Sequence, residues 1–209
     1  SIARDMEWGG NNVEDVKYGV DQITNLINDL RTNPDSRRLM VNAWNVSELE
    51  NMTLPPCHFG FQCYTTEMTF EQRLEHWCKS LDKDISYGND FDENRLDELN
   101  VPKRKLDLKW FQRSVDSPLG LPFNIASYAF LLHLLAREVN MVPNDLIFSG
   151  GDCHIYLDQV EGVKKQLEQE TYKLPTLELS NKSIDDIKYE DFKIVGYQSS
   201  PKIDFPLSN

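Results

Sequence analysis

Apolar residues recur along the chain with two different periods. Every third or fourth position is apolar in three segments, which predicts helices at 20–30, 124–140 and 160–170. Alternating positions or short apolar runs predict strands at 39–44, 58–65, 106–113 and 146–149. Short strands separated by turns are expected from 174 to 209. Helices and strands mixed in this order predict an α+β fold.

Polar residues and prolines set the ends of several elements. The turn residues 33–35 contain a proline and end the first helix. Ser47 is expected to cap a short helix that follows it. Thr69 and Gln72 have the spacing of a capping box, so we expect another helix from there to Leu81.

The segment 66–105 interrupts the strand pattern. It contains the capped helix and then an acidic, turn-rich stretch that reaches Asn100. Strand-like alternation resumes at Leu106. We therefore interpret 66–105 as an insertion between two strands, exposed on the surface, in a chain whose residues 1–209 form a single domain.

The composition narrows the classes of partner. Of the 209 residues, 40% are hydrophobic and 11% aromatic, which suffices for a folded core. The formal net charge of −12 argues against nonspecific binding to DNA, RNA or anionic membranes. The apolar runs are too short to cross a bilayer, so no membrane attachment is expected. An anionic substrate would therefore need a local cluster of positive charge.

The four cysteines give a further expectation. Cys57, Cys63, Cys78 and Cys153 show neither the paired spacing of a metal site nor a dense disulfide pattern. We expect no metal, reduced thiols and therefore a cytoplasmic protein. We interpret Cys63, Cys78 and Cys153 as small, buried hydrophobic residues.

Cys57 is the candidate nucleophile. Pro55 and Pro56 restrict the backbone in front of it, so the thiol has a rigid position. A thiol attacks as the thiolate, which nearby cations and hydrogen-bond donors favour. The sequence offers several arginines for this purpose, among them Arg113. These residues suggest an enzyme that acts on an anionic substrate.

The polar residues near this thiol allow more than one interpretation. His58 follows Cys57 directly, but adjacent strand residues point to opposite faces, so it is a poor base for that thiol. His154 could serve as the base of a cysteine hydrolase, while no ligand spacing supports zinc at either histidine. Asn124 is either a helix cap or a neutral amide that pairs with a flat polar ring.

Five motifs, in order, resemble those of thymidylate synthase. They are DSRR at 35–38, LPPCH at 54–58, QRSVD at 112–116, LGLPFNIASY at 119–128 and GDCHIY at 151–156. The resemblance covers most of residues 20–209. It implies the thymidylate synthase fold, a mixed β-sheet with packed helices that forms a dimer in which two sheets lie back to back.

The resemblance also implies an activity, the reductive methylation of dUMP to dTMP. Cys57 would add as the thiolate to C6 of the pyrimidine. The co-substrate 5,10-methylenetetrahydrofolate would supply the methylene group and then a hydride. The enzyme would be an obligate homodimer in which Arg37 and Arg38 reach the phosphate in the partner's site.

Other residue roles are implied in the same way. With Cys57, the residues implied in catalysis are Arg113, Asp116 and Asn124. Those implied in dUMP binding are Arg37, Arg38, Gln112, Arg113, Ser114, Asn124, His154 and Tyr156. Those implied in folate binding are Asp116, Leu119, Gly120, Phe123 and Ser208. Asn124 would pair with O4 and N3 of uracil, Asp116 would orient the pterin, and residues 206–209 would close over it.

The chain departs from the family pattern in four respects. The family's N-terminal part, with a further phosphate-binding arginine, a catalytic glutamate and a folate-stacking tryptophan, is expected to be missing from this sequence. Asp158-Gln159 replaces the usual asparagine–histidine pair. The insertion at 66–105 is far longer than the usual connection, and residues 206–209 differ from the common valine–alanine ending.

Two other functions stay open. A deoxypyrimidine hydroxymethylase shares the covalent steps but lets water capture the methylene group. Its cytosine-specific form has an aspartate where this chain has Asn124, so the amide favours uracil and leaves a deoxyuridylate hydroxymethylase. The second is a catalytically inactive, nucleotide-binding relative.

Overall fold

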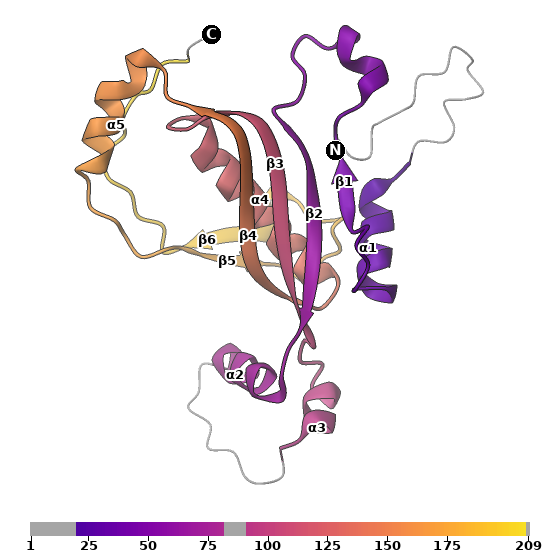
Figure 1. Cartoon of the computed structure of the whole chain (residues 1–209). Helices are drawn as coiled ribbons and strands as arrows, with labels where there is room; N and C mark the ends of the chain where they lie inside the picture. Colours follow the sequence, from indigo (N-terminus) through magenta and orange to yellow (C-terminus); the bar gives the residue numbers. More distant parts are fainter. Residues whose placement is uncertain (1–19, 82–90, 208–209) are drawn as a thin grey trace.

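The computed structural model describes residues 20–81 and 91–207, with a four-stranded sheet at its centre (Figure 1). In spatial order the strands are β1 Met40–Asn42, β2 His58–Glu67, β3 Arg104–Asp116 and β4 Val142–His154. The first three strands pair antiparallel, whereas β3 and β4 pair parallel. The predicted α+β fold with a mixed sheet is therefore confirmed.

Helices and a second strand pair surround this sheet. The described α-helices are α1 Gln22–Thr32, α2 Phe70–Ser80, α3 Glu93–Glu98, α4 Gly120–Glu138 and α5 Val160–Leu167. Short 3-10 turns occur at η2 Val46–Asn51, η3 Leu157–Gln159 and η4 Tyr189–Asp191. The antiparallel pair of β5 Thr176–Leu179 and β6 Phe192–Val195 contacts α4, because the rings of Phe130 and Phe192 lie 4.8 Å apart.

The core lies between the sheet and α4. Alternate residues of β3, Leu106, Leu108 and Trp110, are at most 1% exposed. They pack in one cluster with Leu132 and Leu135 of α4. Fully burying a side chain of this size contributes roughly 1.5–3 kcal/mol relative to leaving it exposed. The alternation read from the sequence therefore determines which face of β3 meets the helix.

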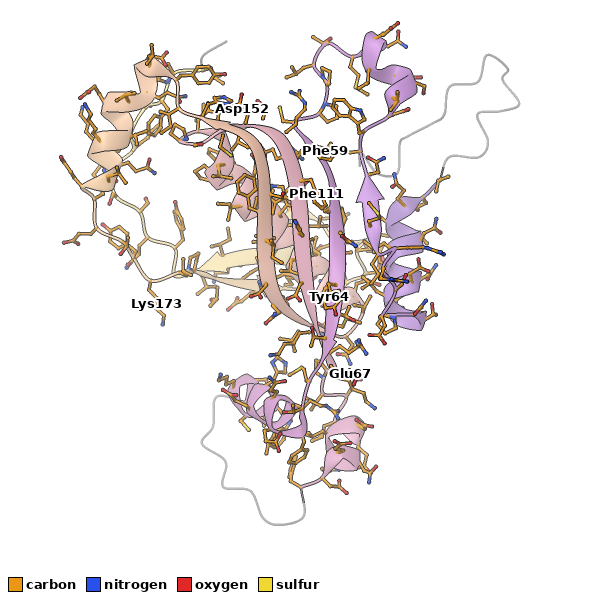
Figure 2. The ribbon with its side chains drawn as sticks, in the orientation of Figure 1. Phe59, Tyr64, Glu67, Phe111, Asp152 and Lys173 are labelled. Atoms are coloured by element: carbon orange, nitrogen blue, oxygen red, sulfur yellow. The ribbon has the colours of Figure 1, made fainter. Side chains whose placement is uncertain are left out.

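The opposite face of the sheet carries exposed hydrophobic side chains. Met40, Tyr64 and Ile147 are 52%, 65% and 43% exposed. On the same face, the rings of Phe59 and Phe111 stack with centroids 6.0 Å apart (Figure 2). Parallel strand pairs are usually covered on both faces, so this face has the character of a contact surface.

In its described parts, residues 66–81 and 91–105, the insertion contains two helices beyond one end of the sheet (Figure 1). The capping box at Thr69 and Gln72 is present and begins α2 as predicted. The helix α3, which begins after Asp92, was missed because its acidic sequence has no clear apolar period. The insertion leaves the sheet where Glu67 pairs with Arg104, so it extends the hairpin of β2 and β3 without shifting its register.

A buried arginine holds the insertion together. Arg73 of α2 is 5% exposed, and its guanidinium donates to Asp97 Oδ1 at 2.6 Å. It also donates to the main-chain oxygens of Val101 at 3.1 Å and Pro102 at 3.3 Å. Buried charge is tolerated when its donors are paired, so one side chain joins both helices to the returning chain.

Two predicted helix starts are wrong. Asn45 caps η2, because its Oδ1 accepts from the Ser47 main-chain N–H at 3.3 Å. The helix α4 begins at Gly120, a full turn before Asn124, and the preceding Leu119 makes no side-chain cap. Asn124 is therefore not a helix cap, which leaves the other interpretation, an amide that pairs with a flat polar ring.

The strand β4 is much longer than the predicted 146–149. It continues through Gly150 and Gly151 to its end at His154. A Cβ on Gly151 would lie 2.8 Å from the main-chain oxygen of Arg113. The glycine therefore permits a close approach of β4 to β3 rather than a loop, which is the other structural use of glycine within a strand.

Candidate active site

Three strands bring distant parts of the chain to one end of the sheet. The register pairs His58 with Gln112, which places Cys57 beside the last third of β3. On the other side of β3, Ser114 lies opposite Asp152 and Asp116 opposite His154. Figure 2 shows Asp152 at this end and Glu67 at the other. The motifs at 54–58, 112–116 and 151–156 therefore meet in space.

Cys57 and Arg113 are in direct contact. Arg113 Nη2 lies 4.0 Å from Cys57 Sγ, and Cys57 is half-buried. The same guanidinium donates to the main-chain oxygens of Pro55 at 2.7 Å and Pro56 at 3.1 Å. The Arg113 main-chain N–H donates to the Cys57 oxygen at 2.8 Å. These bonds fix the thiol next to a permanent positive charge.

An aromatic wall supports this arginine. The guanidinium carbon of Arg113 lies 5.9 Å from the ring centroid of Trp44, within cation–π range. A cavity of about 370 Å³ is lined by Arg113, Trp44, Phe59 and Asn42. Arginine beside an open cavity is suited to an anionic group such as a phosphate. The sequence pattern did not indicate Trp44, whose contact depends on the β1–β2 pairing.

A buried glutamine orients Asn124. Gln112 is 4% exposed, and its Oε1 accepts from Trp110 Nε1 at 3.3 Å. Its Nε2 donates to Asn124 Oδ1 at 3.1 Å and to the Ser114 main-chain oxygen at 3.0 Å. With both ends of the Gln112 amide bonded, the Asn124 side chain has a fixed partner and orientation.

Asp116 accepts two hydrogen bonds at the start of α4. Its Oδ1 accepts from the Leu119 main-chain N–H at 3.0 Å, and its Oδ2 accepts from Gln159 Nε2 at 3.0 Å. A Cβ on Gly120 would lie 3.7 Å from Asp116 Cβ and 3.8 Å from Asn124 Oδ1. Gly120 thus lies between the side chains of Asp116 and Asn124, so the carboxylate and the amide are close to each other in the site.

Two further candidates lie at the end of β4 and just after it. The rings of His154 and Tyr156 meet edge to face, with centroids 4.9 Å apart. His154 Nδ1 lies 3.5 Å from Asp152 Oδ1, and the His154 main-chain oxygen accepts from the Ser117 N–H at 3.0 Å. Phe123, at the start of α4, is 70% exposed and offers an apolar ring to a ligand.

Arg37 and Arg38 are not brought to Cys57 in this chain. Both are exposed and precede β1, whose Met40 pairs with Gln62. Gln62 is five residues along β2 from Cys57, which corresponds to about 17 Å at the usual strand rise. Ser208, the last candidate, lies outside the described residues.

His58 faces away from Cys57. Its Nδ1 forms a hydrogen bond of 3.1 Å with the Tyr128 hydroxyl, and the two rings meet edge to face. Burial lowers the pKa of His58 below its ordinary value and raises the pKa of Tyr128 to about 12. The neutral imidazole therefore serves packing and hydrogen bonding in the core.

The other cysteines differ from one another. Cys63 is buried as predicted, and burial together with the charge of Asp107 raises its thiol pKa to about 12. Cys78 is half-buried and donates to the Leu74 oxygen. Cys153 is exposed, which contradicts the prediction of a buried residue; it lies near the end of β4, which is an edge strand of the sheet.

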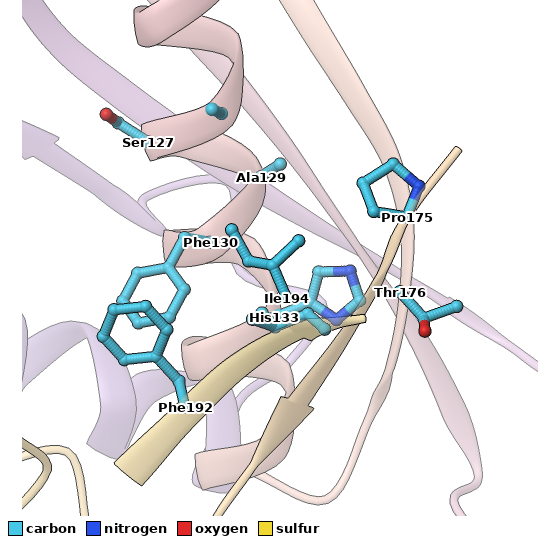
Figure 3. Close-up of a pocket in the computed structure, with 10 residues that line it drawn as sticks. Ser127, Ala129, Phe130, His133, Pro175, Thr176, Phe192 and Ile194 are labelled. Carbon is cyan, nitrogen blue, oxygen red and sulfur yellow. The ribbon is translucent and has the colours of Figure 1, made fainter. Parts of the chain in front are cut away.

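A second, larger cavity lies away from these residues (Figure 3). It has a volume of about 650 Å³ between α4 and the β5–β6 pair, and Phe130, Phe192, Ile194 and His133 are among its lining residues. Burial lowers the pKa of His133, so its ring is neutral at pH 7. The lining is mostly apolar and includes no predicted site residue, so the thiol end of the sheet is the better candidate.

Together these side chains define a class of enzyme. A thiol held against an arginine, beside a buried amide and a carboxylate, fits an enzyme that forms a covalent bond to an anionic, polar ring. The family model of thymidylate synthase matches residues 5–209. The chain therefore belongs to the thymidylate synthase family, and in general terms it is a transferase of nucleotide biosynthesis.

Two observations concern membranes and metals. Among the described residues, no helix is long and apolar enough to cross a membrane. Within 20–81 and 91–207, the histidine, cysteine, aspartate and glutamate side chains form no group of three that could hold a metal ion.

The burial of His58 makes a titration prediction. Its pKa should lie below 6.5, so the unfolded chain binds more protons than the folded one just below that pH. The contribution of His58 to the unfolding free energy should therefore be complete above pH 6.5 and decrease as the pH falls toward the folded-state pKa. NMR titration of the His58 ring measures this pKa.

Tyr128→Phe is the matched variant for this titration. It keeps the ring that buries His58 and removes the hydroxyl, so the His58 pKa should stay lowered. A His58 pKa at or above 6.5 in the unmodified protein would contradict burial as the controlling effect.

Proposed function

We propose that the protein is a cytoplasmic thymidylate synthase. It would convert dUMP and 5,10-methylenetetrahydrofolate into dTMP and dihydrofolate. The main support is the contact of Cys57 Sγ with the Arg113 guanidinium at 4.0 Å, in a chain of the thymidylate synthase family. A thiol that is both rigid and next to a permanent cation is suited to nucleophilic attack.

Cys57 would act as the covalent nucleophile. Its thiolate forms the S–C6 bond, and the C5–C6 π electrons move toward C5 and the O4 carbonyl. C5 then becomes nucleophilic enough to take a one-carbon group. The pair left when C5 loses its proton would form an exocyclic double bond as the folate nitrogen leaves. Hydride addition to that methylene group would return an electron pair to C5, and this pair would restore the C5–C6 double bond as Cys57 leaves as the thiolate. Arg113 would hold the thiolate and contribute to phosphate binding, helped by the hydrogen bonds that fix it to Pro55 and Pro56.

The pyrimidine would be read by an amide. Asn124 can donate to O4 and accept from N3–H, which is the pattern of uracil. Gln112 supports this role because it bonds Asn124 Oδ1 and thereby fixes the amide. Ser114 would join Arg113 at the phosphate, and His154 and Tyr156 would bind the deoxyribose hydroxyl.

The folate would lie against the start of α4. When bound, it supplies the methylene group and the hydride. An exposed Phe123 ring and the Asp116 carboxylate fit a flat heterocycle that carries hydrogen-bond donors. Leu119 and Gly120, at the start of α4, lie between these two residues in the sequence. Ser208 is proposed to contact the folate from the C-terminal tail.

A homodimer would complete the site. The open sheet face with exposed Met40, Tyr64 and Ile147 is suited to packing against a second copy, back to back. Arg37 and Arg38 are exposed and precede Met40, whose partner Gln62 is already about 17 Å along the sheet from Cys57, too far for these arginines to serve the same chain's thiol. We propose that they bind the phosphate in the partner's site.

The identity of the products tests the reaction. Full-length protein supplied with dUMP and 5,10-methylenetetrahydrofolate should give dTMP and dihydrofolate. Tetrahydrofolate with hydroxymethyl-dUMP would instead identify a hydroxymethylase, and dUMP binding without turnover would identify an inactive relative. Cys57→Ser should lower kcat by roughly a thousandfold or more, because the covalent step is lost.

Cys78→Ser is the matched control for that substitution. Its hydroxyl can still donate to the Leu74 oxygen, so activity should be retained. Substantial turnover by Cys57→Ser would refute its role as nucleophile.

The choice of pyrimidine can be tested at Asn124. Asn124→Asp keeps an acceptor for Gln112 but replaces the amide donor that would face O4 of uracil with a carboxylate oxygen, which accepts from the cytosine amino group instead. The ratio of kcat/KM for dCMP to that for dUMP should rise by roughly tenfold or more, measured in competition. Asn28→Asp, on the exposed side of α1, is the control and should leave this ratio unchanged. If Asn124→Asp also left the ratio unchanged, Asn124 would not be the residue that selects uracil.

The shared site can be tested by mixing subunits. Cys57→Ser and the double variant Arg37→Ala with Arg38→Ala should each be nearly inactive. In a random mixture, about half the dimers are hybrids, and each hybrid regains one intact site, so about a quarter of wild-type activity should return. If the arginines served their own chain's thiol, mixing would restore nothing.

A further inference from the structure

Gln159 is a fully buried polar residue that the proposed chemistry does not use. It follows the substrate-binding motif and ends the short turn η3, with 0% of its surface exposed. A buried amide without partners would cost roughly 1–3 kcal/mol. Its hydrogen bonds therefore decide whether it is a tolerated substitution or a functional part of the site.

The amide of Gln159 joins three separate segments. Its Nε2 donates to Asp116 Oδ2 at 3.0 Å and to the Pro206 main-chain oxygen at 3.2 Å. Its Oε1 accepts from the Tyr156 main-chain N–H at 3.2 Å. Both donors and the acceptor are used, so the end of β3, the turn after β4 and the C-terminal tail meet at one side chain.

Only an amide can make this set of bonds with the given acceptors. Asp116 Oδ2 and the Pro206 oxygen are both acceptors, so a single atom must donate two hydrogens. A carboxylate has no hydrogen to donate, and a neutral imidazole nitrogen donates one. Glutamine at position 159 is thus matched to holding the tail and the carboxylate at the same time.

The tail has a second contact on the next helix. A Cβ on Gly162 of α5 would lie 2.6 Å from the Phe205 ring and 3.3 Å from Ile203 Cγ2. The absence of a side chain at Gly162 therefore makes room for the tail. In Figure 1 the C-terminal segment runs beside α5.

We infer that Gln159 is a positioning residue that couples the docking of the C-terminal tail to the orientation of Asp116. When the tail lies on α5, the Pro206 oxygen orients the Gln159 amide, and that amide holds Asp116 Oδ2. Asp116 Oδ1 then fixes the Leu119 N–H at the start of α4. Release of the tail leaves the amide, the carboxylate and this turn less constrained. The functional consequence rests on the proposed function, in which Asp116 orients the folate.

Two variants of full-length protein disrupt the proposed coupling at different places, one at Gln159 and one at the contact between the tail and α5. Gln159→Met keeps the length of the side chain and removes all three hydrogen bonds. Gly162→Ala displaces Phe205 and leaves Gln159 and Asp116 chemically intact. Gln166→Met, at an exposed position of α5, is the matched control.

Hydrogen exchange tests the coupling without any activity. In both variants, amide exchange should rise at residues 203–205 and 207 of the tail and also at Leu119, whose N–H donates to Asp116 Oδ1. The control should change neither. If Gly162→Ala frees the tail while exchange at Leu119 stays at its wild-type rate, the coupling is refuted.

Kinetics test the consequence for the reaction. In both variants the KM for the folate should rise by about tenfold, while the dissociation constant for dUMP stays unchanged. An unaltered folate KM together with faster exchange at Leu119 would show that Asp116 does not orient the folate, which contradicts the functional consequence but not the coupling. If wild-type protein does not turn over, the proposed function fails, and the exchange experiment still decides the coupling.

Discussion

The pairing of β3 with two neighbours is the constraint on which the site depends. On one side it pairs antiparallel with β2, and on the other it pairs parallel with β4. Cys57 and His154 are about a hundred residues apart, yet both come to lie beside the last residues of β3. A shift of one residue would turn Gln112 out of the core and Arg113 into it, because side chains alternate between faces. The register of these strands therefore determines the positions of the site residues as well as the fold.

Local charge and overall charge have opposite signs in this protein. The chain carries a formal net charge of −12, but the side chain that touches the Cys57 sulfur is a guanidinium. Its position is determined by main-chain oxygens of Pro55 and Pro56, which are neutral acceptors and do not offset the positive charge. An overall negative field repels nonspecific polyanions, while a small anion that reaches the cavity beside Arg113 meets a fixed cation.

Local sequence signals predicted local structure well, and long-range partners poorly. The capping box at Thr69 and the alternation that buries Trp110 depend on neighbours within a few residues, so both were confirmed. The start of α4 was misjudged, because apolar spacing became regular only after Pro122. Gln159 was seen merely as a departure from a motif, since its partners Asp116 and Pro206 are more than forty residues away. The motifs at 54–58, 112–116, 119–128 and 151–156 meet in the structure, the 35–38 motif lies apart from them in this chain, and the contacts among these residues required the fold.

The position of the insertion has a consequence for how such a chain can change. It joins β2 to β3 where Glu67 and Arg104 are already neighbours, at the end of the sheet opposite Asp152. Closing a loop between two adjacent ends costs only about 0.6 kcal/mol more for each doubling of its length. This hairpin end can therefore accept new sequence almost freely. It is a natural place for evolution to add a regulatory module, or for an experimenter to graft a reporter, without disturbing the register that aligns the thiol.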